Sequence, residues 1–158
     1  MTPAPLAFLL ALLPGAALAQ GVALGPLVAD PSAPVEVTSE TLTVDQATGA
    51  AVFTGDVVIG QGDLRLQAGE VEVRYDEATQ EIARLLASGG VTLATPTEAA
   101  EAREADYDLA AGTLTLAGDV LLTQGPNAIS ADRMVVDLAA GTARMEGNVR
   151  TILQQAAP

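Results

Sequence analysis

The sequence contains no cysteine, histidine, lysine or tryptophan, and each absence excludes a class of structure or chemistry. Without cysteine, a disulfide framework cannot form, and an N-terminal lipid anchor on cysteine is excluded. Without histidine, cysteine and lysine, the usual nucleophile–base pairs and the imidazole or thiolate metal sites cannot be assembled. We therefore expect a protein that is not an enzyme and that has neither a cofactor nor a metal site.

The charge is strongly one-sided. The chain has 20 acidic residues against 7 basic ones, all arginine, and its net charge is −13. Such a surface repels nucleic acid, whose affinity for proteins comes largely from neutralised phosphates. It also disfavours adsorption to anionic membrane surfaces. Nucleic acid is therefore excluded as a partner.

The first nineteen residues have the features of an export signal. Residues 6–19 form an uncharged apolar run of fourteen, shorter than the roughly 20 residues that span a bilayer. Pro14-Gly15 interrupts this run, and Ala17-Leu18-Ala19 places small residues where a signal peptidase cleaves. We predict cleavage after Ala19, although no basic residue precedes the run. An uncleaved anchor is the alternative.

The remaining chain reads as one domain between two irregular ends. Residues 20–34 carry three prolines with little alternation and are predicted to be an extended leader. Residues 35–153 form the predicted β domain, and residues 154–158 a disordered tail.

A repeated unit dominates the β domain. DLAAGTLTLAGDV at 108–120 returns as DLAAGTARMEGNV at 137–149, and DQATGAAVFTGDV at 45–57 is an earlier copy. A looser copy starts with DEATQ at 76 and reaches its Gly-Gly-Val at 89–91. The leading aspartates, Asp45, Asp76, Asp108 and Asp137, stand 31, 32 and 29 residues apart. A period near thirty indicates stacked repeats, none of which buries its apolar face alone.

Within each unit, alternate residues are apolar before and after the aspartate, which is typical of strands with one buried face. Asp-x-x-x-Gly fits a hairpin turn in which the aspartate accepts backbone N–H groups and the glycine has positive φ. Gln80 replaces that glycine in the second copy, which also has three extra residues, so we expect a differently shaped loop there. The unit is therefore predicted to be strand, turn, strand, turn, strand.

Three further features of the sequence suggest a helix, a catalytic carboxylate pair and a calcium site, and the surrounding residues argue against each. Thr97–Ala105 has good helix formers where the repeat places a strand, and we expect a loop or a single helical turn. The pairs Asp106/Asp108 and Glu70/Glu72 alternate with apolar residues, which favours a solvated strand face over a catalytic carboxylate pair. Gly60-Gln61-Gly62-Asp63 lacks the nine-residue reiteration of a calcium-binding β-roll and is predicted to be a turn.

The ordered series of Gly-[Asp/Asn]-Val segments after short hairpins resembles the OstA-like domain of the lipopolysaccharide-transport family. VFTGDVVIGQGDLRLQAGEVEV at 52–73 and ISADRMVVD at 129–137 add to the resemblance. It covers about Val35 to Arg150 and is nearest to the soluble periplasmic bridge of that system. The resemblance implies a twisted, open-ended β-jellyroll in the periplasm whose apolar interior holds lipid A acyl chains of lipopolysaccharide. It also implies partners in an inner-membrane transport complex and an outer-membrane translocon.

The alternating apolar positions are the candidate lining of that interior, as a set: Leu42, Val44, Phe53, Val57, Ile59, Leu64, Leu66, Val73, Tyr75, Val91, Leu93, Tyr107, Leu114, Leu116, Val120, Leu122, Met134, Val136 and Met145. The same alternation is equally typical of a plain packed core, and the sequence does not separate the two.

An open-ended sheet exposes unpaired backbone groups at its first and last strands, which favours head-to-tail homo-oligomers. We place these edges at 35–44 and 149–153, with the candidate contacts Val35, Val37, Val149, Thr151 and Leu153. A secreted structural β-repeat and a docking module without a lipid ligand remain the alternative functions.

Overall fold

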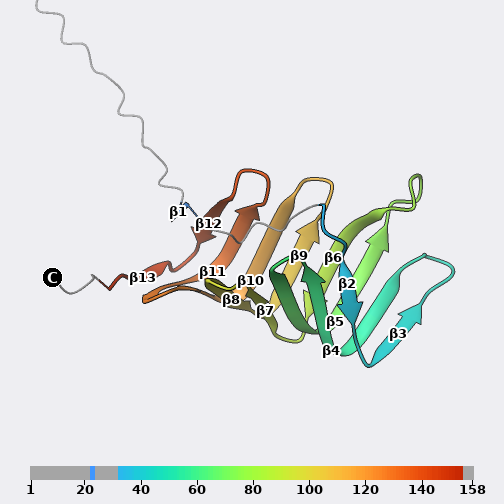
Figure 1. Cartoon of the computed structure of the whole chain (residues 1–158), viewed down its shortest axis with the longest axis horizontal. Helices are drawn as coiled ribbons and strands as arrows, with labels where there is room; N and C mark the ends of the chain where they lie inside the picture. The colour runs from blue at the N-terminus through green and yellow to red at the C-terminus, as the bar shows by residue number, and fades with distance from the viewer. Residues whose placement is uncertain (1–21, 24–31, 155–158) are drawn as a thin grey trace, which may run out of the picture.

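The computed structural model describes residues 22–23 and 32–154, in which every regular element is a β-strand (Figure 1). The predicted signal peptide lies outside these residues, as do 20–21 and 24–31 of the leader and 155–158 of the tail. The described part forms one antiparallel sheet of thirteen strands: β1 Val22–Ala23, β2 Glu36–Thr38, β3 Thr41–Val44, β4 Ala51–Gln61, β5 Leu64–Tyr75, β6 Ile82–Ser88, β7 Val91–Ala94, β8 Glu98–Ala102, β9 Glu104–Asp108, β10 Thr113–Gln124, β11 Asn127–Asp137, β12 Thr142–Glu146 and β13 Arg150–Ile152. The predicted all-β fold is confirmed. No helix in the described residues has the length and apolar character needed to cross a membrane.

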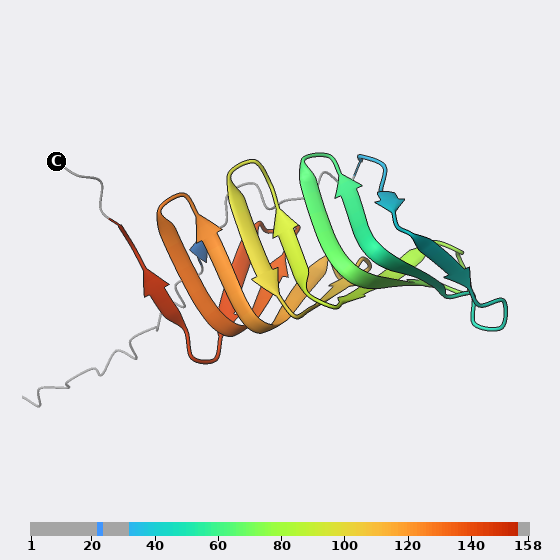
Figure 2. The same ribbon diagram turned by 90° about the horizontal axis from the view of Figure 1, so that it is seen from below.

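From β2 to β13 the chain runs back and forth, and we call each run a pass. β4, β5, β10 and β11 each form a whole pass, whereas β2–β3, β6–β7, β8–β9 and β12–β13 each form one in two pieces. Every pass bends midway, so that its two halves lie in different layers, and the sheet is thereby folded along its length (Figure 2). Two passes make one sequence repeat, which explains the period near thirty residues.

The hydrogen-bonded registers define the two layers. Layer A runs β3, β4 (51–54), β5 (70–75), β6, β9, β10 (113–117), β11 (133–137), β12 and β1. Layer B runs β2, β4 (57–61), β5 (64–68), β7, β8, β10 (120–124), β11 (127–131) and β13. The layers join at the bends, and neither layer closes on itself, so the fold is an open-ended jellyroll.

Every second pass bends at a Gly-[Asp/Asn/Gly] pair, one in each copy of the repeat: Gly55-Asp56, Gly89-Gly90, Gly118-Asp119 and Gly147-Asn148. Gly118 has φ +85° and Asp119 φ +48°, and this pair forms a β-bulge between Ala117 and Val120. A Cβ on Gly118 would lie 3.0 Å from the side chain of Arg103 on the neighbouring pass. Both the positive φ and this close approach favour glycine. Equivalent contacts pair Gly55 with Glu40, Gly89 with Gly69, and Gly147 with Asp132.

The aspartate turns lie on the opposite, open side of the folded sheet. In the second turn, Asp76 Oδ1 accepts the N–H groups of Ala78 at 2.8 Å and Thr79 at 3.1 Å. The hydrogen bond from Thr79, followed by that from Ala78, lowers the pKa of Asp76. Asp45 and Asp137 accept equivalent pairs of N–H groups.

The prediction that the loop of the second turn has a different shape is wrong. Gln80 has φ +59°, close to the +66° of Gly112 in the third turn, so the loop has the same shape with a strained residue in it. The three extra residues instead lengthen the segment between the turn and the bend, where β6 spans seven residues.

Replacing Gln80 with glycine should raise the free energy of unfolding by about 0.5–1 kcal/mol, because glycine adopts positive φ without a Cβ penalty. The gain stays modest because the hydrogen bond from Gln80 Nε2 to the Glu77 carbonyl is lost. Urea unfolding measures the change. The reciprocal control is Gly112→Gln, where space is open around the Cβ and a loss of similar size is expected.

The expected loop or helical turn at Thr97–Ala105 is also wrong, because most of it is β8 and the start of β9. β8 pairs with β7 on one side and with β10 on the other, and Ala100 is fully buried. Pairing on both sides and burial of small side chains outweigh the helix propensity of this stretch.

Candidate functional site

The interior between the two layers is lined by continuous rows of cross-strand neighbours. One row in layer A runs Val44, Ala51, Val73, Leu85, Tyr107, Leu114, Val136 and Ala143. The next row runs Leu42, Phe53, Val71, Ala87, Ala105, Leu116, Met134 and Met145. Each row crosses the whole layer from β3 to β12, and no charged residue interrupts it.

Layer B faces these rows with an apolar row of its own. It runs Val37, Ile59, Leu66, Leu93, Ala100, Leu122 and Ile129 before it reaches Thr151 on β13. Nearer the open side of layer B, the lining becomes polar. There Gln124 Nε2 donates to Glu98 Oε1 at 2.7 Å, and Gln61 Nε2 donates to the Ala33 carbonyl at 3.2 Å.

The structure buries sixteen of the nineteen predicted lining residues, fully or in part, and leaves three exposed. The buried ones are Val57, Ile59, Val73, Val91, Leu93, Leu114, Leu116, Val120, Leu122, Met134 and Val136. The partly buried ones, packed against this core, are Phe53, Leu64, Leu66, Tyr107 and Met145. The exposed ones are Leu42, Val44 and Tyr75, which all lie near the β3 end.

The space left between the layers is small. A cavity of about 70 Å³ lies among Leu66, Leu85, Leu93 and Tyr107. For comparison, an engineered apolar cavity of about 150 Å³ holds benzene. The interior described here is therefore nearly filled by side chains, and an acyl chain could enter only if the layers moved apart.

Two turn leucines that the sequence analysis did not single out help to fill the open side. Leu109 and Leu138 follow the turn aspartates, line the cavity and pack against the core. Their backbone N–H groups donate to the carbonyls of Ala83 and Gly112. A comparison of the repeats could have found them, because the first two copies have the polar residues Gln46 and Glu77 where the last two have leucine.

Burial raises the pKa of Tyr107, whose register partners in the layer A row are Leu85 and Leu114. A raised pKa means that the neutral phenol contributes stability below the ordinary pKa of about 10. That contribution is lost as the pH rises through the raised value.

Both ends of the folded sheet expose apolar side chains. At the β2–β3 end, Val35 is 37% exposed and Val37 is partly buried. At the β13 end, Val149, Ile152 and Leu153 are 50%, 49% and 69% exposed, and Thr151 is also exposed. The predicted edge residues thus lie at opposite ends of the molecule, and Ile152 joins them.

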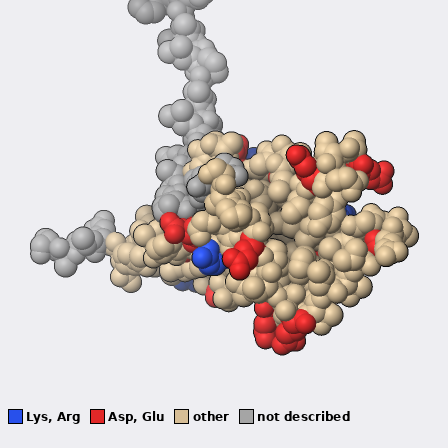
Figure 3. Space-filling view, turned by 45° about the vertical axis from the view of Figure 1, so that its right-hand side comes forward, with Lys and Arg blue, Asp and Glu red and all other residues tan. Residues whose placement is uncertain are grey.

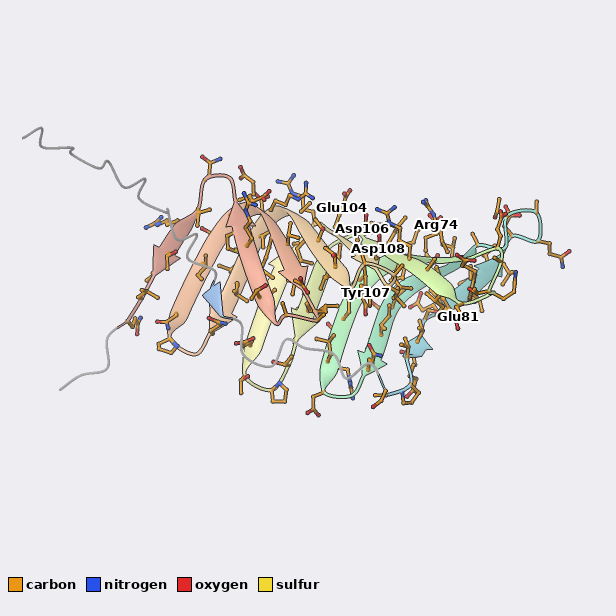
Figure 4. The ribbon with its side chains drawn as sticks, turned by 90° about the horizontal axis from the view of Figure 1, so that it is seen from above. Arg74, Glu81, Glu104, Asp106, Tyr107 and Asp108 are labelled. Carbon is orange, nitrogen blue, oxygen red and sulfur yellow. The ribbon has the colours of Figure 1, made fainter. Side chains whose placement is uncertain are left out.

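Carboxylates form separate patches on the face seen in Figure 3, where most of the surface carries neither an acidic nor a basic residue. Along β9, Glu104, Asp106 and Asp108 alternate with inward Ala105 and Tyr107 (Figure 4). Arg84 Nε donates to Asp106 at 2.7 Å, and this hydrogen bond, with the charge of Asp106, raises the pKa of Arg84. Glu72 is likewise paired with Arg74 at 2.7 Å. One member of each pair considered for catalysis, Asp106/Asp108 and Glu70/Glu72, is therefore held in a surface ion pair.

The described residues thus form an open-ended jellyroll with an apolar interior and a charged outer strand face, the architecture of a binding, transport or structural protein. By sequence, no curated protein matches the chain. Residues 36–142, about two thirds of the chain, match the family described as LptA/(LptD N-terminal domain) LPS transport protein. The chain belongs to this family of lipopolysaccharide transport proteins. The membership confirms the resemblance seen in the sequence and the prediction that the protein is not an enzyme.

A solved structure has the same fold. It is LptH from Pseudomonas aeruginosa, titled the LptA homologous periplasmic component of the conserved lipopolysaccharide transport device. The TM-score is 0.71 at 17% sequence identity, over 80% of this chain and 99% of that chain.

Proposed function

We propose that the protein is a periplasmic component of lipopolysaccharide transport that shields lipid A acyl chains between its two layers. The observation that carries the proposal is the uninterrupted apolar rows, which extend from β3 to β12 in layer A. Each CH₂ removed from water contributes about 0.8 kcal/mol, so a twelve-carbon chain contributes roughly 9 kcal/mol. This is sufficient to offset a substantial cost of separating the layers.

The acidic exterior supports separate positions for the acyl chains and the anionic head group of the lipid. With a net charge of −13 and no lysine, the outer surface repels anionic sugars and phosphates. The head group accordingly stays in solvent at the open side, while the acyl chains occupy the interior.

We further propose that copies join head to tail and link an inner-membrane transport complex to an outer-membrane translocon. The exposed apolar residues at both ends support this, as do the end strands β2, β3 and β13. Unpaired edge strands associate readily with other strands, and last-to-first pairing is a heterologous contact that extends into filaments.

Photo-crosslinkers test the lipid site. Placed at Phe53 and Met145, which are partly buried lining residues, they should capture lipopolysaccharide. The matched controls are the exposed neighbours Thr54 and Arg144 on the same strands. Capture at the controls but not at the lining positions would contradict the proposal.

Tyr107 offers a spectroscopic test. Tyr75→Phe leaves Tyr107 as the one tyrosine, since the chain has only two. Bound acyl chains should desolvate the phenol further and shift its ionisation midpoint, measured by absorbance, to higher pH. By linkage, lipid should bind more weakly once the pH rises above the midpoint of the free protein. An unchanged midpoint with saturating lipopolysaccharide would place the lipid elsewhere.

The filled interior favours one competing function, a structural β-repeat or docking module without a lipid ligand. Mass spectrometry of the purified protein distinguishes the two. Co-purifying lipid A supports transport, and its absence after exposure to lipopolysaccharide supports the structural role.

A further inference from the structure

The two layers differ at the β12–β13 end. In layer B, within the described residues, β13 pairs with β11 alone and leaves its outer edge free. In layer A, β12 pairs with β11 on one side and with β1 on the other. The register places Val22 opposite Ala143 and Ala23 opposite Thr142. A segment from the start of the chain thus lies against a strand near its end (Figure 1).

We propose that β1 is an exchangeable cap on the edge of β12, and that a second copy of the chain displaces it with β3 when two copies join. This inference rests on the proposed head-to-tail assembly. A joint that continues both layers must pair β13 with the second copy's β2, and β12 with its β3. The first of these edges is free, but the second is occupied by β1.

The lengths of the strands favour exchange. β1 pairs with two residues of β12, which has five, whereas β3 has four residues to offer. The arriving copy therefore forms more backbone hydrogen bonds along β12 than the cap, and it gains the β2–β13 pairing as well.

The cap has the opposite advantage in a dilute monomer. It belongs to the same chain, so its pairing with β12 does not depend on the protein concentration, whereas pairing with a second copy does. A covered edge also resists unspecific strand pairing. Capping thus keeps separate copies apart until both layers of a second copy are aligned, when the combined pairing outweighs the two-residue contact.

A disulfide lock tests the exchange. Ala23→Cys with Thr142→Cys joins register partners in a chain that has no other cysteine. The matched control is Glu101→Cys with Leu121→Cys, which joins register partners of β8 and β10 away from both ends. Oxidation of the first pair should yield an intramolecular disulfide and weaken self-association at least tenfold, measured by sedimentation velocity across a concentration series. Oxidation of the control pair should leave association unchanged.

A release variant tests the same idea in the other direction. Val22→Pro with Ala23→Pro removes both N–H groups of β1 and should strengthen self-association at least tenfold. The proposal is overturned if the lock forms no intramolecular disulfide, if the locked protein associates as tightly as its reduced form, or if the release variant associates no better than the parent.

The substitutions Ile152→Glu with Leu153→Glu at the β13 end separate the cap from head-to-tail joining. If they abolish association while the lock has no effect, head-to-tail joining stands and the cap is wrong. If the lock abolishes association while those charges have no effect, the cap stands and β13 is not part of the joint.

Discussion

Leu116→Ala will lower the free energy of unfolding by about 3 kcal/mol, within the range found for leucines in packed cores. Leu116 is fully buried in the second row of layer A, between Ala105 and Met134. Alanine would leave a void next to residues that are themselves buried, and the β pairing on both sides of β10 prevents the backbone from closing it. Urea unfolding monitored by circular dichroism measures the loss.

The matched control is Leu42→Ala, the same substitution in the same row at its exposed end. Leu42 is 53% exposed, and its truncation should cost less than about 1 kcal/mol. Equal losses at the two positions would mean that the middle of the interior is no better packed than its end, which contradicts the small cavity. A lipid that stabilises the Leu116→Ala protein more than the parent would show that the void accepts acyl carbon.

Ile152→Glu with Leu153→Glu should abolish end-to-end association while leaving the monomer folded. Both side chains are exposed at the β13 end, so the substitutions remove little burial from the monomer. In a joint, the new carboxylates would be desolvated and would approach the exposed Glu36 on β2 of the next copy. We expect association to weaken by more than tenfold, measured by light scattering.

The control for added charge is Ala110→Glu with Ala111→Glu, in an exposed turn far from both ends. It makes the net charge more negative by the same amount and should leave association nearly intact at physiological salt, because charges beyond roughly 8 Å are screened. Loss of association in this control as well would attribute the effect to overall repulsion rather than to the joint.

Alternation predicted sixteen side chains that the structure buries fully or in part. It also predicted three that are exposed, Leu42, Val44 and Tyr75, and it missed the buried Val71, Leu85 and Ile129. The aspartate turn at 137–141 sets the register of β11 on β12, because its fixed length brings Val136 opposite Ala143 and Met134 opposite Met145. The sequence predicted turns at the Gly-Asp-Val segments, but β4 and β10 continue through them as bulged bends. The pairing of the bends with Glu40, Gly69, Arg103 and Asp132 depends on the neighbouring pass and is not a local signal.

Three features could not be predicted from the residues alone. The filling of the interior depends on the distance between two layers that alternation does not specify. β8 forms because strands pair with it on both sides, which its own helix-forming residues do not indicate. β1 lies in a proline-containing segment without alternation, and its partner β12 is more than a hundred residues away.

The lengthwise fold separates two dimensions of the molecule. The number of residues between one turn and the next determines the width of the apolar interior, while the number of repeats determines its length. Each added unit of about thirty residues would extend the molecule by two strand spacings, roughly 10 Å, with the same cross-section. Duplication or deletion of one unit therefore changes the length of such a protein in discrete steps without redesigning what it encloses.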